Sequence, residues 1–206
     1  MNTEIGFKSN QGLNSLEFTL FTNSYDNLLG ADTAASGGGS DELFNGGAVD
    51  ISGFELYLRR ILVDNGRIQM PLELSWTSTN SEFQESFDGF WGEVSKGDEL
   101  PYLPDTMIAL NLGLNVDKLS ANISMKKTSE MRTVAGSGRI AESNATDELT
   151  IIDLGLRYAL QDNIRLSVGI NNFMDDDGIA ARRPYGARPT MPRSFSLGVD
   201  LSLIHI

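Results

Sequence analysis

The chain has no cysteine and a single histidine, and these two absences narrow the chemistry open to it. Without thiols it forms no disulfides and offers no thiolate metal ligands. The one histidine, His205, lies next to the C-terminus, which disfavours histidine-based catalysis and histidine-ligated metals. No nucleophile–base pair, phosphate-binding glycine loop or metal-ligand spacing rises above background. We therefore expect neither an enzyme nor a bound cofactor or metal.

Positive charge is also scarce. Lysine and arginine number 16 against 28 aspartates and glutamates, which leaves a formal net charge of −12. Such a chain repels a phosphate backbone and has no basic patch to hold one. Nucleic acid is therefore not an expected partner.

Long apolar runs are missing as well. No stretch approaches the roughly 20 apolar residues that a transmembrane helix needs. A mean hydropathy of −0.17 does not argue against a β-barrel, because alternating strands keep this average low. Asn2, Glu4 and Lys8 interrupt the N-terminal segment, so it is not a signal peptide. If the protein is exported as a barrel, we expect its native N-terminus to lie upstream of Met1.

The sequence is dominated by strict period-two alternation of apolar and polar residues, the pattern of a strand with two unlike faces. In the clearest segment the apolar positions are Ile68, Met70, Leu72, Leu74 and Trp76. The same pattern predicts strands at 3–9, 15–25, 50–62, 67–77, 106–115, 119–126, 152–160, 164–171 and 194–201. We count about nine strands and expect no helix.

The connections between these strands alternate in length. Short turns are expected at 10–14, 64–66, 116–118 and 161–163. Long loops rich in Gly, Ser, Asp, Asn and Pro are expected at 28–48, 80–105, 133–148 and 174–192. This rhythm is typical of an up-and-down meander, and outer-membrane barrels keep their short turns on the periplasmic side. The last strand then ends in the periplasm.

A soluble β-sandwich is the main alternative, because its strands also alternate. Greek-key connections mix loop lengths, however, and the non-apolar face here carries many ionisable groups that a wet lumen accommodates. We expect the following side chains to face a lumen, in cross-strand pairs or plug contacts: Glu55, Arg59, Glu73, Asp153, Arg157 and Arg165. Trp76 and Tyr158 suit aromatic girdles on the lipid face.

Two C-terminal stretches resemble a known family. Residues 162–177, DNIRLSVGINNFMDDD, resemble the penultimate strand of TonB-dependent receptors and the start of their last external loop. Residues 182–193, RRPYGARPTMPR, followed by SFSLGVDL, resemble the last loop and closing strand of the ferric-dicitrate-transporter-like branch. Thr190 stands where that pattern usually has glycine, so the local turn is expected to differ. A weaker similarity to an earlier strand pair covers 4–9 and 18–29.

The resemblance implies a fold, a location and partners. The family's barrels have about 22 strands around a plug. They import ferric siderophores, ferric citrate or cobalamin across the Gram-negative outer membrane. Residues 1–200 would be the C-terminal part of such an all-β, antiparallel, up-and-down transmembrane barrel, open if isolated. The implied partners are a ferric chelate, TonB acting through an N-terminal plug, and outer-membrane lipid and lipopolysaccharide.

Four arginines in the last loop are candidate ligand-binding residues: Arg182, Arg183, Arg188 and Arg193. Guanidinium forks suit the carboxylates of an anionic chelate such as ferric citrate. The alternative is that they pair with lumen acids or lipopolysaccharide phosphates and shape the loop. The aspartate run 175–177 has oxygens for Ca²⁺, but at a loop entrance we interpret it as a solvated turn.

The last residues, 201–206, are unusual for this family. Its barrels usually end on an aromatic residue, whereas this chain ends LSLIHI. One reading frame of a common transposase adapter used in sequencing libraries encodes the same six residues. Our hypothesis is that residues from about 201 onward are not native.

Energy-coupled uptake of a ferric chelate is the leading functional prediction. A smaller passive pore is a second possibility, although single-chain bacterial barrels close on an even number of strands. A soluble sandwich acting as a binding module is a third. If the chain is a barrel segment, both edge strands lack partners, so alone it is expected to aggregate or to remain an open curved sheet.

Overall fold

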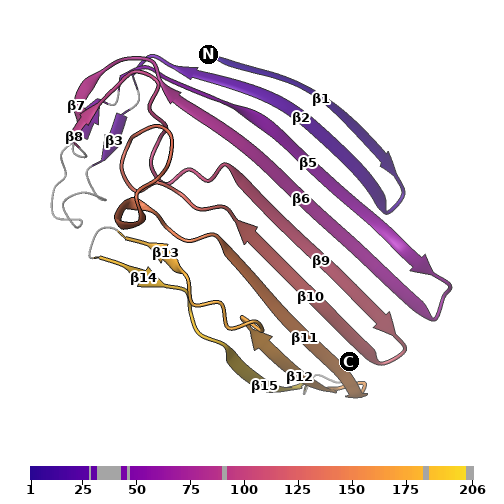
Figure 1. The fold of residues 1–206 in the computed structure, drawn as a ribbon. Helices are drawn as coiled ribbons and strands as arrows, with labels where there is room; N and C mark the ends of the chain where they lie inside the picture. The colour runs from indigo at the N-terminus through magenta and orange to yellow at the C-terminus, as the bar shows by residue number, and fades with distance from the viewer. Residues whose placement is uncertain (28, 32–42, 46, 90–91, 183–185, 203–206) are drawn as a thin grey trace.

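The computed structural model of the chain is built almost entirely from antiparallel β-strands (Figure 1). It describes residues 1–27, 29–31, 43–45, 47–89, 92–182 and 186–202. Within these ranges the single helical element is one 3₁₀ turn, η1 (Glu142–Asn144). Across this described part, no helix is long and apolar enough to cross a membrane.

Nine long strands form one sheet, and each pairs antiparallel with the next in the chain. They are β1 (Asn2–Gln11), β2 (Asn14–Tyr25), β5 (Val49–Asp64), β6 (Ile68–Phe83), β9 (Thr106–Val116), β10 (Leu119–Thr128), β11 (Leu149–Gln161), β12 (Ile164–Asn171) and β15 (Ser194–Leu201). Each coincides with one segment predicted from alternation, so the nine-stranded meander is confirmed. Figure 1 shows the four short turns at one end of the sheet and the long loops at the other.

The long loops contain strands that the sequence pattern did not predict. Three small hairpins lie in them: β3 (Leu29–Ala31) with β4 (Leu43–Asn45), β7 (Phe87–Gly89) with β8 (Gly92–Val94), and β13 (Ile179–Ala181) with β14 (Arg188–Pro189). β6 continues to Phe83, beyond the predicted loop start at 80, whereas β10 ends at Thr128. The last residues of these strands are largely polar, so the apolar alternation does not show where each strand ends. Backbone pairing continues there without it.

The sheet is open, with β1 and β15 at its two edges. Eight antiparallel pairings separate these two strands, so they run in the same direction. Pairing β1 directly with β15 would therefore be parallel. Closure of this meander by antiparallel pairing alone requires further strands between its edges.

Register places the apolar side chains on one face, here called the apolar face. One row across it contains Leu112, Ile123, Leu154, Ile170 and Phe195. The neighbouring row ends on Leu197, a residue that is 85% exposed. Because a continuous apolar face of this extent is unfavourable in water, it requires an apolar environment or another layer.

The small buried core lies at the long-loop end of the sheet, not along its face. Val49 and Phe83, at paired ends of β5 and β6, are buried together with Val94 of the β7–β8 hairpin. Phe87 packs edge-on against Phe83, with ring centroids 5.4 Å apart. Among the described residues no second large sheet covers the apolar face. The arrangement therefore lacks the two packed layers that define a β-sandwich.

We predict that Gly53→Ala strongly destabilises the sheet. Gly53 in β5 lies opposite Phe21, and an added Cβ would stand 2.0 Å from the Ser78 carbonyl oxygen and 2.9 Å from the Phe21 ring. Backbone cannot yield as a flexible side chain does, so we expect a loss of about 1–3 kcal/mol. Urea unfolding of the protein in detergent measures it. Ser52→Ala, at the adjacent position, is the control, and an equal midpoint for both variants would contradict the prediction.

Candidate functional site

The face opposite the apolar face, here called the polar face, carries all six predicted lumen residues. The register of the strands places all six on the same face. Arg59, Glu73 and Asp153 belong to a single row that crosses β5, β6, β9, β10 and β11. The other three lie at positions of the same parity on their strands: Glu55, Arg157 and Arg165. That they share one face is thus a property of the fold, whereas their exposure to a barrel lumen stays a prediction.

The polar face contains the expected cross-strand charge pair. Arg59 Nε lies 3.5 Å from Glu73 Oε1, and both side chains are nearly half exposed. Ion pairs in such positions contribute at most about 1 kcal/mol. Asp153 has a different role, since its Oδ1 accepts the backbone N–H of Asn172 at 2.8 Å. The acid therefore positions the start of the last loop.

The two predicted girdle aromatics both lie on the apolar face. Trp76 is 40% and Tyr158 42% exposed. The Trp76 ring meets Phe54 edge-on, with centroids 4.9 Å apart and planes at 81°. Their level in a membrane stays a prediction.

Buried Arg132 joins two of the long loops. Its Nε donates to Glu99 Oε2 at 2.7 Å, and one terminal nitrogen donates to the Gly138 carbonyl at 3.1 Å. The side chain is only 7% exposed, so it depends on these partners to remain buried as a cation. Loops 84–105 and 129–148 are thereby bound to one another.

Arg182 attaches the last long loop to both of these. Its backbone N–H donates to the Tyr102 hydroxyl at 3.4 Å, and its guanidinium donates to the carbonyls of Ala145 and Glu142, the latter at 2.9 Å. Three long loops therefore meet at this residue. Its guanidinium has a structural role that the proposed ligand role would have to share.

Asn172 is the centre of the last loop and is 3% exposed, with a positive φ of 50°. Its amide nitrogen donates to the carbonyls of Asp176 and Met191, both at 2.9 Å. Its amide oxygen accepts the N–H of Asp176 at 3.0 Å. The two family-like stretches, 162–177 and 182–193, are therefore in direct contact through one side chain.

The aspartates that follow Asn172 also bind the chain itself. Asp176 accepts the N–H groups of Thr150 and Gly178 through its two carboxylate oxygens, at 2.9 and 3.1 Å. Asp175 accepts the backbone N–H of Arg193 at 2.8 Å and forms an ion pair with its guanidinium at 3.3 Å. In the part of the chain that is described, no three His, Cys, Asp or Glu side chains are grouped to hold a metal.

The four candidate arginines thus have different settings. Arg182 and Arg193 both donate to loop carbonyls, and Arg193 also forms an ion pair with Asp175. Arg188 lies exposed in β14, and Arg183 falls outside the described residues. Their role in ligand binding stays a prediction.

A hollow of about 460 Å³ between loops 84–105 and 129–148 was not expected from the sequence. Its charged lining residues are Glu99, Asp105, Glu130, Arg132, Arg139 and Glu148. Partial burial, together with Glu99 and Glu130, raises the pKa of the Asp105 carboxyl, while Arg132 opposes the rise. Loop residues have no periodic pattern, so no sequence signal brings these charges together.

Comparison with known proteins agrees with this geometry. The family model for the TonB dependent receptor-like β-barrel matches residues 1–173. The chain therefore belongs to the TonB-dependent receptor β-barrel family. No curated protein matches it.

Solved structures show the same fold. The ferric-catecholate import receptor Fiu of E. coli K12 superposes with a TM-score of 0.71 at 18% identity. The ferric yersiniabactin uptake receptor FyuA of Yersinia pestis superposes with a TM-score of 0.72 at 15% identity. The siderophore receptor PiuA of Acinetobacter baumannii superposes with a TM-score of 0.72 at 19% identity. Each match covers 97% of this chain but only 27%, 29% and 28% of those receptors, respectively. At such identities the likeness concerns the fold alone.

We predict that Asn172→Ala loosens the last loop. It removes three hydrogen bonds from a buried amide and places alanine at a positive φ. Leaving buried groups unpaired costs about 1–3 kcal/mol, so hydrogen exchange across 173–182 and 186–193 should accelerate about tenfold or more. Mass spectrometry of deuterium uptake measures this.

Two variants separate the causes of that effect. Asn172→Gly relieves the backbone strain but also lacks the amide, and should exchange nearly as fast as alanine. Asn171→Ala loses only an exposed contact to Ser194 Oγ and should resemble the wild type. Protection retained in Asn172→Gly would show that backbone conformation, not the amide, orders the loop.

Proposed function

We propose that this chain is part of an outer-membrane receptor that takes up ferric chelates without altering them chemically. The observation that carries the proposal is the nine-stranded meander with one apolar and one polar face, in a chain of the TonB-dependent receptor family. The names of the similar structures, which are receptors for ferric siderophores, support a ferric chelate as cargo.

The dimensions of the apolar face support a place in the membrane. On β11 the apolar positions run from Ile152 to Leu160, a rise of about 27 Å along the strand. With the tilt of about 40° usual in such barrels, this corresponds to roughly 20 Å of height, near the ~25 Å apolar band of outer-membrane barrels. The long loops then lie outside the cell and the short turns in the periplasm.

The ligand would reach the barrel at the long-loop end. There the polar face meets the loops that Arg132 and Arg182 bind together. Exposed Arg188 and the charged hollow beside Arg132 provide polar groups for a chelate. We propose that energy comes from TonB through a plug outside this chain, and that lipopolysaccharide contacts the outer part of the apolar face.

Uptake tests this directly. Deleting the gene in its host should abolish accumulation of ⁵⁵Fe from at least one member of a panel of ferric catecholates, ferric hydroxamates and ferric citrate. Dissipating the inner-membrane proton gradient should do the same, because TonB-dependent transport is energy-coupled. Uptake that persists after dissipation, but is lost on deletion, would indicate a passive pore. Unchanged uptake of every chelate in the deletion strain would refute the proposal.

The isolated chain should not form a closed monomeric barrel. Its edge strands β1 and β15 run in the same direction, so neither can complete the other by antiparallel pairing. In lipid, a row of unpaired backbone groups is very unfavourable. We expect residues 1–206 expressed alone to aggregate or to stay an open sheet in detergent. A monomer whose electrophoretic mobility changes on heating, as closed barrels show, would contradict this.

A further inference from the structure

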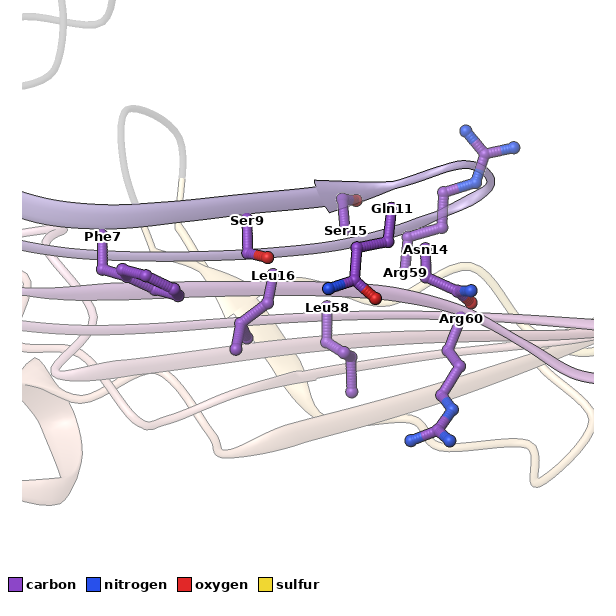
Figure 2. Close-up of a pocket in the computed structure, with 9 residues that line it drawn as sticks. All are labelled: Phe7, Ser9, Gln11, Asn14, Ser15, Leu16, Leu58, Arg59 and Arg60. Carbon is purple, nitrogen blue, oxygen red and sulfur yellow. The ribbon is translucent and has the colours of Figure 1, made fainter.

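The apolar face changes character near the short turns of β1, β2 and β5. A hollow of about 390 Å³ lies there, lined on the apolar face by Phe7, Ser9, Gln11, Asn14, Leu16, Leu58 and Arg60 (Figure 2). Phe7, Leu16 and Leu58 form its apolar part. The row beyond them, towards the turns, is polar.

Two arginines border this hollow, Arg59 and Arg60, and only Arg60 lies on the apolar face. It pairs in register with Leu72 and so lies on the apolar face, whereas its neighbour Arg59 pairs with Glu73 on the polar face. Figure 2 shows the two guanidinium groups on opposite sides of the sheet. Arg59 has a carboxylate partner at 3.5 Å. Arg60 has apolar Leu58 and Leu72 as its neighbours on this face, and no carboxylate is among the described residues that line the hollow.

Asn14 supports an anion site beside Arg60. Its Oδ1 accepts the backbone N–H of Ile61 at 2.9 Å, which orients the amide at the end of β2. The amide nitrogen then remains as a donor in the hollow that Arg60 also lines, and Gln11 lies opposite Asn14 in register. Arginine and amide donors of this kind suit a phosphate group.

We propose that this hollow binds one phospholipid, with its phosphate on Arg60 and Asn14 and an acyl chain along Phe7, Leu16 and Leu58. The change from Leu58 to Arg60 takes place over about 7 Å of strand, the scale of the boundary between acyl chains and headgroups. The inference rests on the proposed function. If the protein lies in the outer membrane as proposed, its short turns lie at the periplasmic leaflet, where the available lipid is phospholipid.

Native mass spectrometry of the detergent-extracted native protein, titrated with dioleoylphosphatidylglycerol, tests the site. We expect Arg60→Gln to weaken binding of this lipid about tenfold, as loss of a charge-assisted contact predicts. Arg60→Lys, which keeps the positive charge, should bind this lipid more tightly than Arg60→Gln does. Arg59→Gln, one residue away on the other face, is the matched control and should bind as the wild type does.

Two further probes identify what is bound. Dioleoylglycerol, which has the same chains and no phosphate, should bind the wild type about tenfold more weakly than the phospholipid. Inorganic phosphate in large excess should not displace the phospholipid. Equal binding of both lipids by the wild type would overturn the site even if Arg60→Gln fails to assemble. Displacement by phosphate would overturn the lipid assignment in favour of a free anion.

Membrane fractionation separates this inference from the proposed function. A protein that fractionates with the outer membrane but binds phospholipid equally in the wild type and Arg60→Gln would refute the lipid site alone. Recovery of the native protein in the aqueous fraction would refute the proposed function and the site with it.

Discussion

Antiparallel register is the constraint on which the other features of this molecule depend. Because side chains alternate between faces, a shift of one residue in any strand would move its apolar residues to the polar face. Four successive pairings hold Leu112, Ile123, Leu154, Ile170 and Phe195 in one row and leave Asp153, Arg157 and Arg165 on the opposite face. A single sheet thereby presents one apolar and one polar surface without a second layer.

The long-loop end is held together differently. Strand pairing ends there, and single side chains connect segments that are far apart in sequence. Arg132 reaches Glu99 across 33 positions, and Arg182 reaches Glu142 across 40. Asn172 holds both ends of the last loop. Arginine and asparagine donors make these contacts with backbone carbonyls and, for Arg132, with the Glu99 carboxylate. Three of the long loops are thereby connected.

Charge has three distinct uses in this architecture. On the polar face, half-exposed pairs such as Arg59 with Glu73 contribute little to stability and keep the surface hydrated. In the loops, buried Arg132 depends on its acid partner. On the apolar face, Arg60 lies in β5 beside the polar ends of β1 and β2, whereas its partner Leu72 in β6 is apolar. None of these three local roles can be inferred from the strongly acidic net charge of the chain.

Period-two alternation was sufficient to predict the nine strands and their two faces, because side-chain direction in a strand follows from position alone. The alternation of short and long connections predicted the order of the strands. The settings of Arg182, Arg193 and Asp176 could not be predicted in this way. Their partners lie in other loops, and loops have no period from which contacts can be inferred. The hairpins β7–β8 and β13–β14 were missed for the same reason. The sequence by itself determined the sheet, whereas only the tertiary structure decided which loop residues meet, since those contacts arise from long-range hydrogen bonds.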